Sequence, residues 1–131
     1  MVRLYLFVEG QTEQTFANNL LRDHLAQYGI GLSIMLIAHC YKKGVAHRGG
    51  GSKYQPMHND IVRLLKQEKK SDVYFSTMID LYALMADFPG QAEAEKHRDR
   101  PIDRVKSLEC AFEKKIDDPR FIAYLQLHEF E

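Results

Sequence analysis

Residues 2–28, VRLYLFVEGQTEQTFANNLLRDHLAQY, predict a strand, a turn and a helix in direct succession. Val2 to Val8 is almost continuously apolar and rich in aromatic and branched side chains, which is typical of a strand covered on both faces. Glu9-Gly10 ends this run. The apolar positions that follow have the three-to-four spacing of an amphipathic helix, which stops near Gly29. The chain therefore opens as an α/β protein.

The rest of the chain repeats this alternation. Further buried strands are expected at 32–38, 73–79 and 121–127, and further helices from Pro56 into the lysines at 66–70 and over 102–116. Residues 41–54 read as a surface loop, and 91–100 as a polar segment without periodicity. The order β-α-β-α-β-α-β requires crossover helices between parallel strands. We therefore predict a three-layer α/β fold, with a mainly parallel four-stranded sheet and helices on both faces.

Composition narrows the functional classes. The 131 residues suit one domain, and 18 Lys and Arg balance 18 Asp and Glu, so no overall field attracts a polyanion. Any nucleic-acid contact must come from a local basic patch. Cys40 and Cys110 match no ligand spacing, and the start of the chain lacks a signal-peptide layout. The apolar runs reach only about six to eight residues, too short to span a membrane. We expect a soluble, cytoplasmic protein.

The chain stops at Glu131, directly after a predicted strand and without a covering helix. A natural end at a sheet edge would explain this. We favour the alternative that residues 1–131 form a single domain truncated at the C-terminus relative to a longer protein, with apolar surface left for another segment.

Acidic residues follow three of the predicted strands: Glu9, Asp80, and Glu129 with Glu131 after His128. The carboxyl ends of parallel strands share one edge, where α/β proteins bind ligands. These acids could therefore hold one hard cation, Mg²⁺ or Mn²⁺. Alternatively, Glu9 satisfies free helix amides and the terminal acids are merely solvated.

Residues 41–54 combine glycines with cations suited to wrapping phosphates. The candidate contacts are Lys42, Lys43, Arg48 and Lys53. Gly50 stands where a Walker A loop needs lysine, and zinc ligation by His39, Cys40 and His47 lacks a second pair. A flexible solvated loop is the alternative reading.

Four segments together resemble the DUF4276 family: VEGQTEQTFANNLL, GGGSKY, TMIDLYALMADFPG and RFIAYLQLHEFE. They span nearly the whole chain. The resemblance implies a Toprim-like, Rossmann-like domain, similar to the metal-dependent domain of topoisomerases, primases and overcoming-lysogenization-defect nucleases. It also implies a partner ATPase encoded nearby, in presumed anti-phage defence loci.

The resemblance implies functional acids after the first and third strands, matched by Glu9 and Asp80. Toprim domains usually carry Asp-x-Asp at the second place, whereas this chain has Asp80-Leu81-Tyr82. The missing ligand would have to come from Asp87, Glu129 or Glu131. The family pattern also continues beyond HEFE, in line with truncation.

Our expected function is magnesium-dependent cleavage of nucleic-acid phosphodiesters. Asp80 and one or more of Glu9, Glu129 and Glu131 would hold the ion, and Glu9 could alternatively act as general acid or base. The alternative is a non-catalytic module, with a vestigial acidic crevice, that docks an ATPase or forms a homodimer with a second copy.

Overall fold

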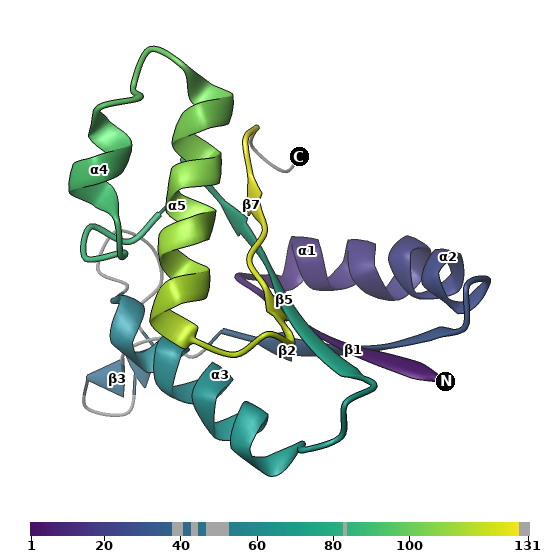
Figure 1. Ribbon diagram of the computed structural model, residues 1–131. Coiled ribbons are helices and arrows are strands. Elements are labelled where there is room, and N and C mark those ends of the chain that lie inside the picture. The colour runs from purple at the N-terminus through teal and green to yellow at the C-terminus, as the bar shows by residue number, and fades with distance from the viewer. Residues whose placement is uncertain (38–40, 43–44, 47–52, 83, 129–131) are drawn as a thin grey trace.

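The computed structural model describes residues 1–37, 41–42, 45–46, 53–82 and 84–128. Its centre is a parallel sheet in the order β2-β1-β5-β6, with β7 also paired to β5 (Figure 1). The strands are β1 (Val2–Val8), β2 (Ile30–Leu36), β5 (Val73–Asp80), β6 (Phe121–Ile122) and β7 (Leu125–Gln126). The predicted α/β class and its parallel sheet are confirmed.

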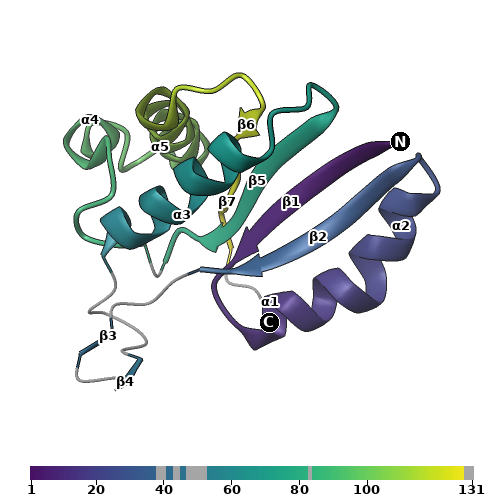
Figure 2. The ribbon, with the colours of Figure 1, turned by 90° about the horizontal axis from the view of Figure 1, so that it is seen from below.

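Helices cover both faces of this sheet (Figure 2). One face carries a continuous helical rod made of α1 (Gln11–Phe16), the π-helical segment η1 (Ala17–Leu21) and α2 (Arg22–Ala26). The other carries α3 (Tyr54–Gln67), α4 (Gln91–Glu95) and α5 (Pro101–Ile116). The molecule therefore has three layers, as predicted.

Among the described helices, none has the length and apolar character needed to cross a membrane.

Successive side chains of each strand point to opposite faces of the sheet, so the core consists of two clusters, one under each layer of helices. Leu6 and Val8 of β1 join the smaller cluster under the α1–α2 rod, whereas Phe7 between them joins the larger cluster under α3 and α5. The larger cluster is aromatic: Phe112 contacts the rings of Tyr54, Phe88 and Phe121 with centroid separations of 5.7, 4.9 and 4.8 Å. The sheet is thus buried on both sides, as its continuous apolar runs predict.

The register of β1, β5 and β7 determines which residues are neighbours at the carboxyl ends of these strands. Val8 pairs with Met78, and both belong to the cluster under the α1–α2 rod. Asp80 stands two residues beyond Met78 and therefore on the same face, and its partner in β7 is Gln126.

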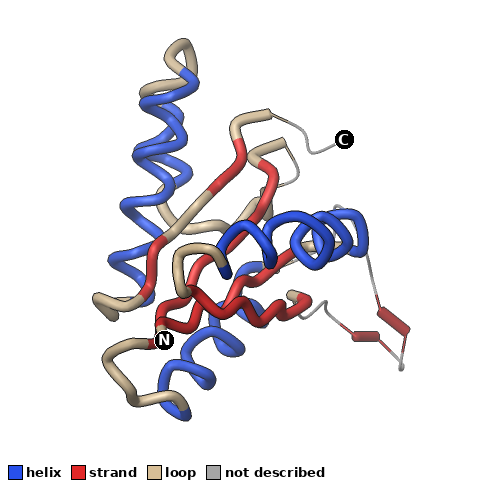
Figure 3. The backbone as a smooth tube through the Cα atoms, turned by 90° about the vertical axis from the view of Figure 1, so that its right-hand side faces the viewer, coloured by secondary structure: helices blue, strands red, loops and turns tan. Residues whose placement is uncertain are grey.

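The last strand is shorter than the predicted 121–127. Figure 3 shows β6 and β7 as two separate strands, and both keep the same register offset against β5. Between them, side-chain hydroxyls of β5 replace the backbone ladder. Thr77 Oγ1 donates to Tyr124 O (2.9 Å) and accepts from Tyr124 N (3.2 Å). Ser76 Oγ donates to Ile122 O at 2.7 Å. A polar side chain inserted between two strands thus splits a strand that periodicity reads as continuous.

Carboxylates of α5 satisfy two other amides of this split strand. Ala123 N donates to Glu113 Oε1 at 3.1 Å, and Leu125 N donates to Glu109 Oε2 at 2.9 Å. Charge-assisted bonds of this kind hold the strand against the helix as well as against β5.

Two further predictions need correction. Residues 91–95 form α4, because Gly90 in a left-handed conformation (φ +83°) turns the chain into a helix whose Ala94 is fully buried. Within the predicted 41–54 loop, β3 (Tyr41–Lys42) and β4 (Val45–Ala46) pair antiparallel.

Candidate carboxylate site

Glu9 and Asp80 meet at the carboxyl edge of the sheet. Glu9 follows β1 directly, and Gly10 is the N-cap of α1. The Glu9 carboxylate accepts a hydrogen bond from the backbone N–H of Asp80, the last residue of β5. Two acids far apart in the sequence are therefore neighbours.

The surroundings of Glu9 oppose its negative charge. Burial raises the pKa of its carboxyl to about 7, helped by the negative charges of Asp80 and Glu13 and opposed by the hydrogen bond from Asp80 N. Glu9 thus titrates near neutral pH. A nearby positive charge or a proton would relieve the repulsion.

One oxygen of Glu9 is left unsatisfied. Within the described part of the chain, Glu9 Oε1 is buried and has no hydrogen-bond partner. A buried oxygen without a donor is costly, and a cation would satisfy it. Among the described residues, no group of three or more His, Cys, Asp or Glu is arranged to hold a metal ion. Mg²⁺, however, commonly binds to only one or two carboxylates and completes its coordination with waters and substrate phosphates. The oxygens of Glu9 and Asp80 therefore fit a hard cation of this kind.

The other predicted site residues have different outcomes. Glu129, Glu131, Lys43 and Arg48 lie outside the described residues. Only the backbone of Lys42, in β3, is described.

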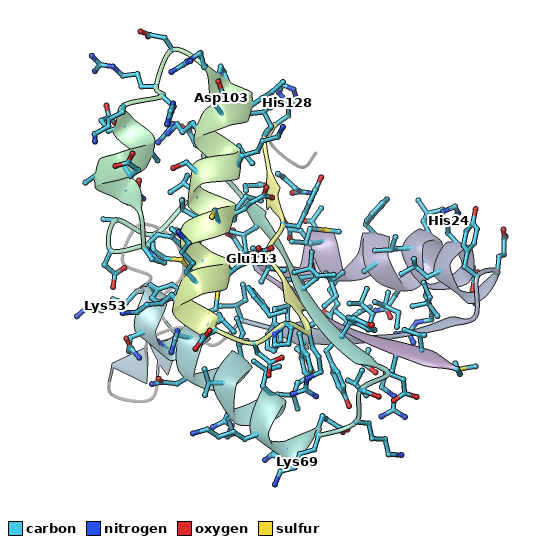
Figure 4. The ribbon with its side chains drawn as sticks, in the orientation of Figure 1. His24, Lys53, Lys69, Asp103, Glu113 and His128 are labelled. Atoms are coloured by element: carbon cyan, nitrogen blue, oxygen red, sulfur yellow. The ribbon has the colours of Figure 1, made fainter. Side chains whose placement is uncertain are left out.

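Lys53 is the exposed N-cap residue of α3, and Figure 4 shows its side chain directed away from the sheet. Asp87, a possible substitute ligand, instead accepts a hydrogen bond from Tyr54 N at 3.0 Å and so satisfies an amide in the first turn of α3. Tyr82, two residues after Asp80, is 84% exposed.

Sequence reasoning missed Gln126. This residue lies opposite Asp80 in the register, and its side-chain oxygen is buried without a hydrogen-bond partner in the described part of the chain. Its only signal in the sequence is its place in the run Leu125-Gln126-Leu127, just before the acids of HEFE.

Fold and site together define a parallel α/β domain with an acidic pair at the carboxyl edge of its sheet. The family model "Domain of unknown function (DUF4276)" matches residues 8–131. The chain belongs to the DUF4276 family. No curated protein matches the chain, and no solved structure does.

Two of the four family-like segments, VEGQTEQTFANNLL and TMIDLYALMADFPG, meet at the site, whereas the FPG end of the second lies elsewhere. VEGQTE provides Glu9 and MIDLY provides Asp80. The FPG motif has a packing role: Phe88 is 2% exposed in the aromatic core, and a Cβ on Gly90 would lie 2.5 Å from Ala111 Cβ of α5.

Proposed function

We propose that this domain is a Toprim-like, metal-dependent phosphodiesterase that cleaves nucleic acid, with Glu9 and Asp80 as its catalytic and metal-binding acids. The observation that supports it is the meeting of these two carboxylates at the edge where parallel α/β sheets bind ligands. Like-charged groups placed together in partial burial destabilise a fold unless something neutralises them. Carboxyl groups with a raised pKa, such as Glu9, are frequent at functional sites.

In this proposal Asp80 and Glu9 hold Mg²⁺ or Mn²⁺, which would polarise the phosphate and lower the pKa of a bound water. The chain's own contribution is positioning and proton handling. The hydrogen bond from the backbone N–H of Asp80 holds the Glu9 carboxylate next to the end of β5. Alternatively, where Glu9 does not hold the ion, its pKa of about 7 would let it hold or release a proton at neutral pH, as a general acid or base requires.

Substrate contact is proposed for the basic residues Lys42, Lys43, Arg48 and Lys53. Cations of this kind bind the phosphate backbone without reading its sequence. Of the four, Lys53 has a described side chain, and it is exposed and available to a polyanion. A partner ATPase and a role in anti-phage defence are proposed from the family resemblance.

The test is a plasmid nicking assay with Mg²⁺ or with EDTA. We expect Glu9→Gln and Asp80→Asn to reduce the magnesium-dependent rate by about a hundredfold or more, because each removes a charge from the site. Glu95→Gln, which removes an exposed carboxylate on α4 paired with Arg98, is the matched control and should cleave normally. Equal rates for all four proteins would refute the proposed site.

A second candidate function is docking of a second copy, and an exposed apolar surface favours it. Tyr74, Ile122 and Tyr124 are 37, 52 and 50% exposed. The register places them on the face of β5–β7 that also carries Met78, beside the α1–α2 rod. Sedimentation of the wild type and an Ile122→Ser/Tyr124→Ser double variant tests this. A wild type that stays monomeric at high concentration would exclude the homodimer and leave the ATPase as the partner to examine.

A further inference from the structure

The pairing of β5 with β7 places Gln126 next to Asp80. It is the β7 residue opposite Asp80, and Leu81 N donates to Gln126 O at 2.9 Å. Partners in a parallel pair have side chains on the same face of the sheet. The side chain of Gln126 therefore shares the face of Asp80, next to the strand end to which Glu9 is bonded.

Two oxygens at this edge lack donors within the described part of the chain. Glu9 Oε1 and Gln126 Oε1 are each buried and without a hydrogen-bond partner. Glu9 follows β1 and Gln126 ends β7, and these two strands pair with opposite edges of β5. A buried amide or carboxylate oxygen normally finds a donor, and an acceptor without one calls for an explanation.

The position of Gln126 is fixed from both sides. Leu125 N donates to Glu109 Oε2 of α5 at 2.9 Å, and Gln126 O accepts from Leu81 N. Helix α5 and the residue that follows β5 thus hold the β7 backbone with Gln126 opposite Asp80.

We infer that Gln126 supplies a third, neutral oxygen ligand to the cation site formed by Glu9 and Asp80, an inference that rests on the proposed function. Amide carbonyl oxygens, like carboxylates, suit Mg²⁺ and Mn²⁺. Tyr82, two residues beyond Asp80, carries no carboxylate and is 84% exposed, so the further oxygen would come from the neighbouring strand β7.

The test measures Mn²⁺ affinity by calorimetry on the whole chain. Gln126→Met keeps the side-chain length but removes the oxygen, and we expect about tenfold weaker binding. Gln126→Glu adds a carboxylate and should bind Mn²⁺ more tightly than the wild type. Gln91→Met is the matched control, because the Gln91 side-chain amide donates a hydrogen bond to Met85 O at 3.1 Å and so has a structural role. Its Mn²⁺ affinity should be unchanged.

Thermal unfolding without metal separates ligation from a structural role. Gln126→Met removes an unsatisfied buried oxygen, so its Tm in EDTA should equal or exceed that of the wild type. A lower Tm with unchanged Mn²⁺ affinity would overturn the inference. So would weaker Mn²⁺ binding by Gln126→Glu, or a wild type that binds no Mn²⁺.

The nicking assay on the same proteins distinguishes the two proposals. Suppose that the wild type cleaves the plasmid, that Glu9→Gln does not, and that Gln126→Met keeps both cleavage and full Mn²⁺ affinity. This result would refute the inference about Gln126 and leave the proposed function intact. Mn²⁺ binding that depends on Gln126 without any cleavage would refute the proposed function alone.

Discussion

Glu9 is the residue on which the proposed chemistry of this domain chiefly depends. Its position after a buried strand is readable from the sequence, but its charge state depends on what surrounds it. Burial and the charges of Asp80 and Glu13 together raise its pKa to about 7. At the residue scale the domain therefore holds a carboxyl group that is nearly balanced between its two protonation states at neutral pH.

This raised pKa predicts a pH-dependent stability. A carboxyl whose folded pKa exceeds its unfolded value stabilises the fold fully below the unfolded pKa, and this contribution disappears as the pH rises through the folded pKa. The ordinary pKa of a glutamate is 4.5 and the folded pKa of Glu9 is about 7, so Tm should fall between about pH 5 and pH 8 in EDTA.

Glu9→Gln isolates this effect from other titrating groups. The pKa of Glu109 is also raised, chiefly by burial, and that of His58 is lowered by burial, so both contribute to the whole curve. The difference between wild type and Glu9→Gln, measured by thermal unfolding at each pH, should change over the same interval. Parallel curves for the two proteins would mean that Glu9 keeps its ordinary pKa.

At the scale of elements, α5 organises both the core and the site. Its inner face contributes Leu108 and Phe112 to the aromatic cluster, while Glu109 and Glu113 bond the amides of the last strand. Helical periodicity predicts the first of these roles from the sequence. The second cannot be predicted in this way, because a glutamate on the polar side of a helix normally reads as solvated.

The close approach of the Phe88–Gly90 turn to α5 gives a prediction at this scale. A Cβ at Gly90 would lie 2.5 Å from Ala111 Cβ, and its φ of +83° is unfavourable for alanine. Gly90→Ala should cost about 1–2 kcal/mol for the left-handed backbone and a further ~1–3 kcal/mol for overpacking, measured by urea unfolding.

Gly29→Ala is the matched control for this substitution. Gly29 has a similar φ of +74°, but a Cβ added there would meet nothing within 4 Å. Only the backbone cost of about 1–2 kcal/mol is expected at this position. Equal losses for the two variants would show that α5 does not pack closely against Gly90.

At the scale of the whole molecule, the site joins strands from three separate regions of the chain. Glu9 follows β1, Asp80 ends β5, and Gln126 ends β7. The unfolded chain does not hold these groups together, so a cation that binds them binds the native state in preference. Ligand binding and folding are then thermodynamically linked.

This linkage predicts metal-dependent thermal stability. At Mn²⁺ concentrations about 100-fold above Kd, the wild type should gain about 2.7 kcal/mol of stability, visible as a higher Tm than in EDTA. Asp80→Asn should lose most of this gain, whereas Glu95→Gln, away on α4, should retain it. A Tm unaffected by Mn²⁺ in the wild type would argue against a cation site at this edge.

Hydrophobic periodicity and turn residues act over short distances, so the amino-acid pattern predicts the alternation of strands and helices and places Glu9 and Asp80 at strand ends. Which residues meet depends on the folded chain: Glu9 lies beside Asp80, Gln126 lies opposite Asp80, and Asp87 caps the start of α3 instead of joining the site. Strand register and side-chain insertion, as at Thr77, arise from packing between distant segments, and no local pattern in the chain encodes them.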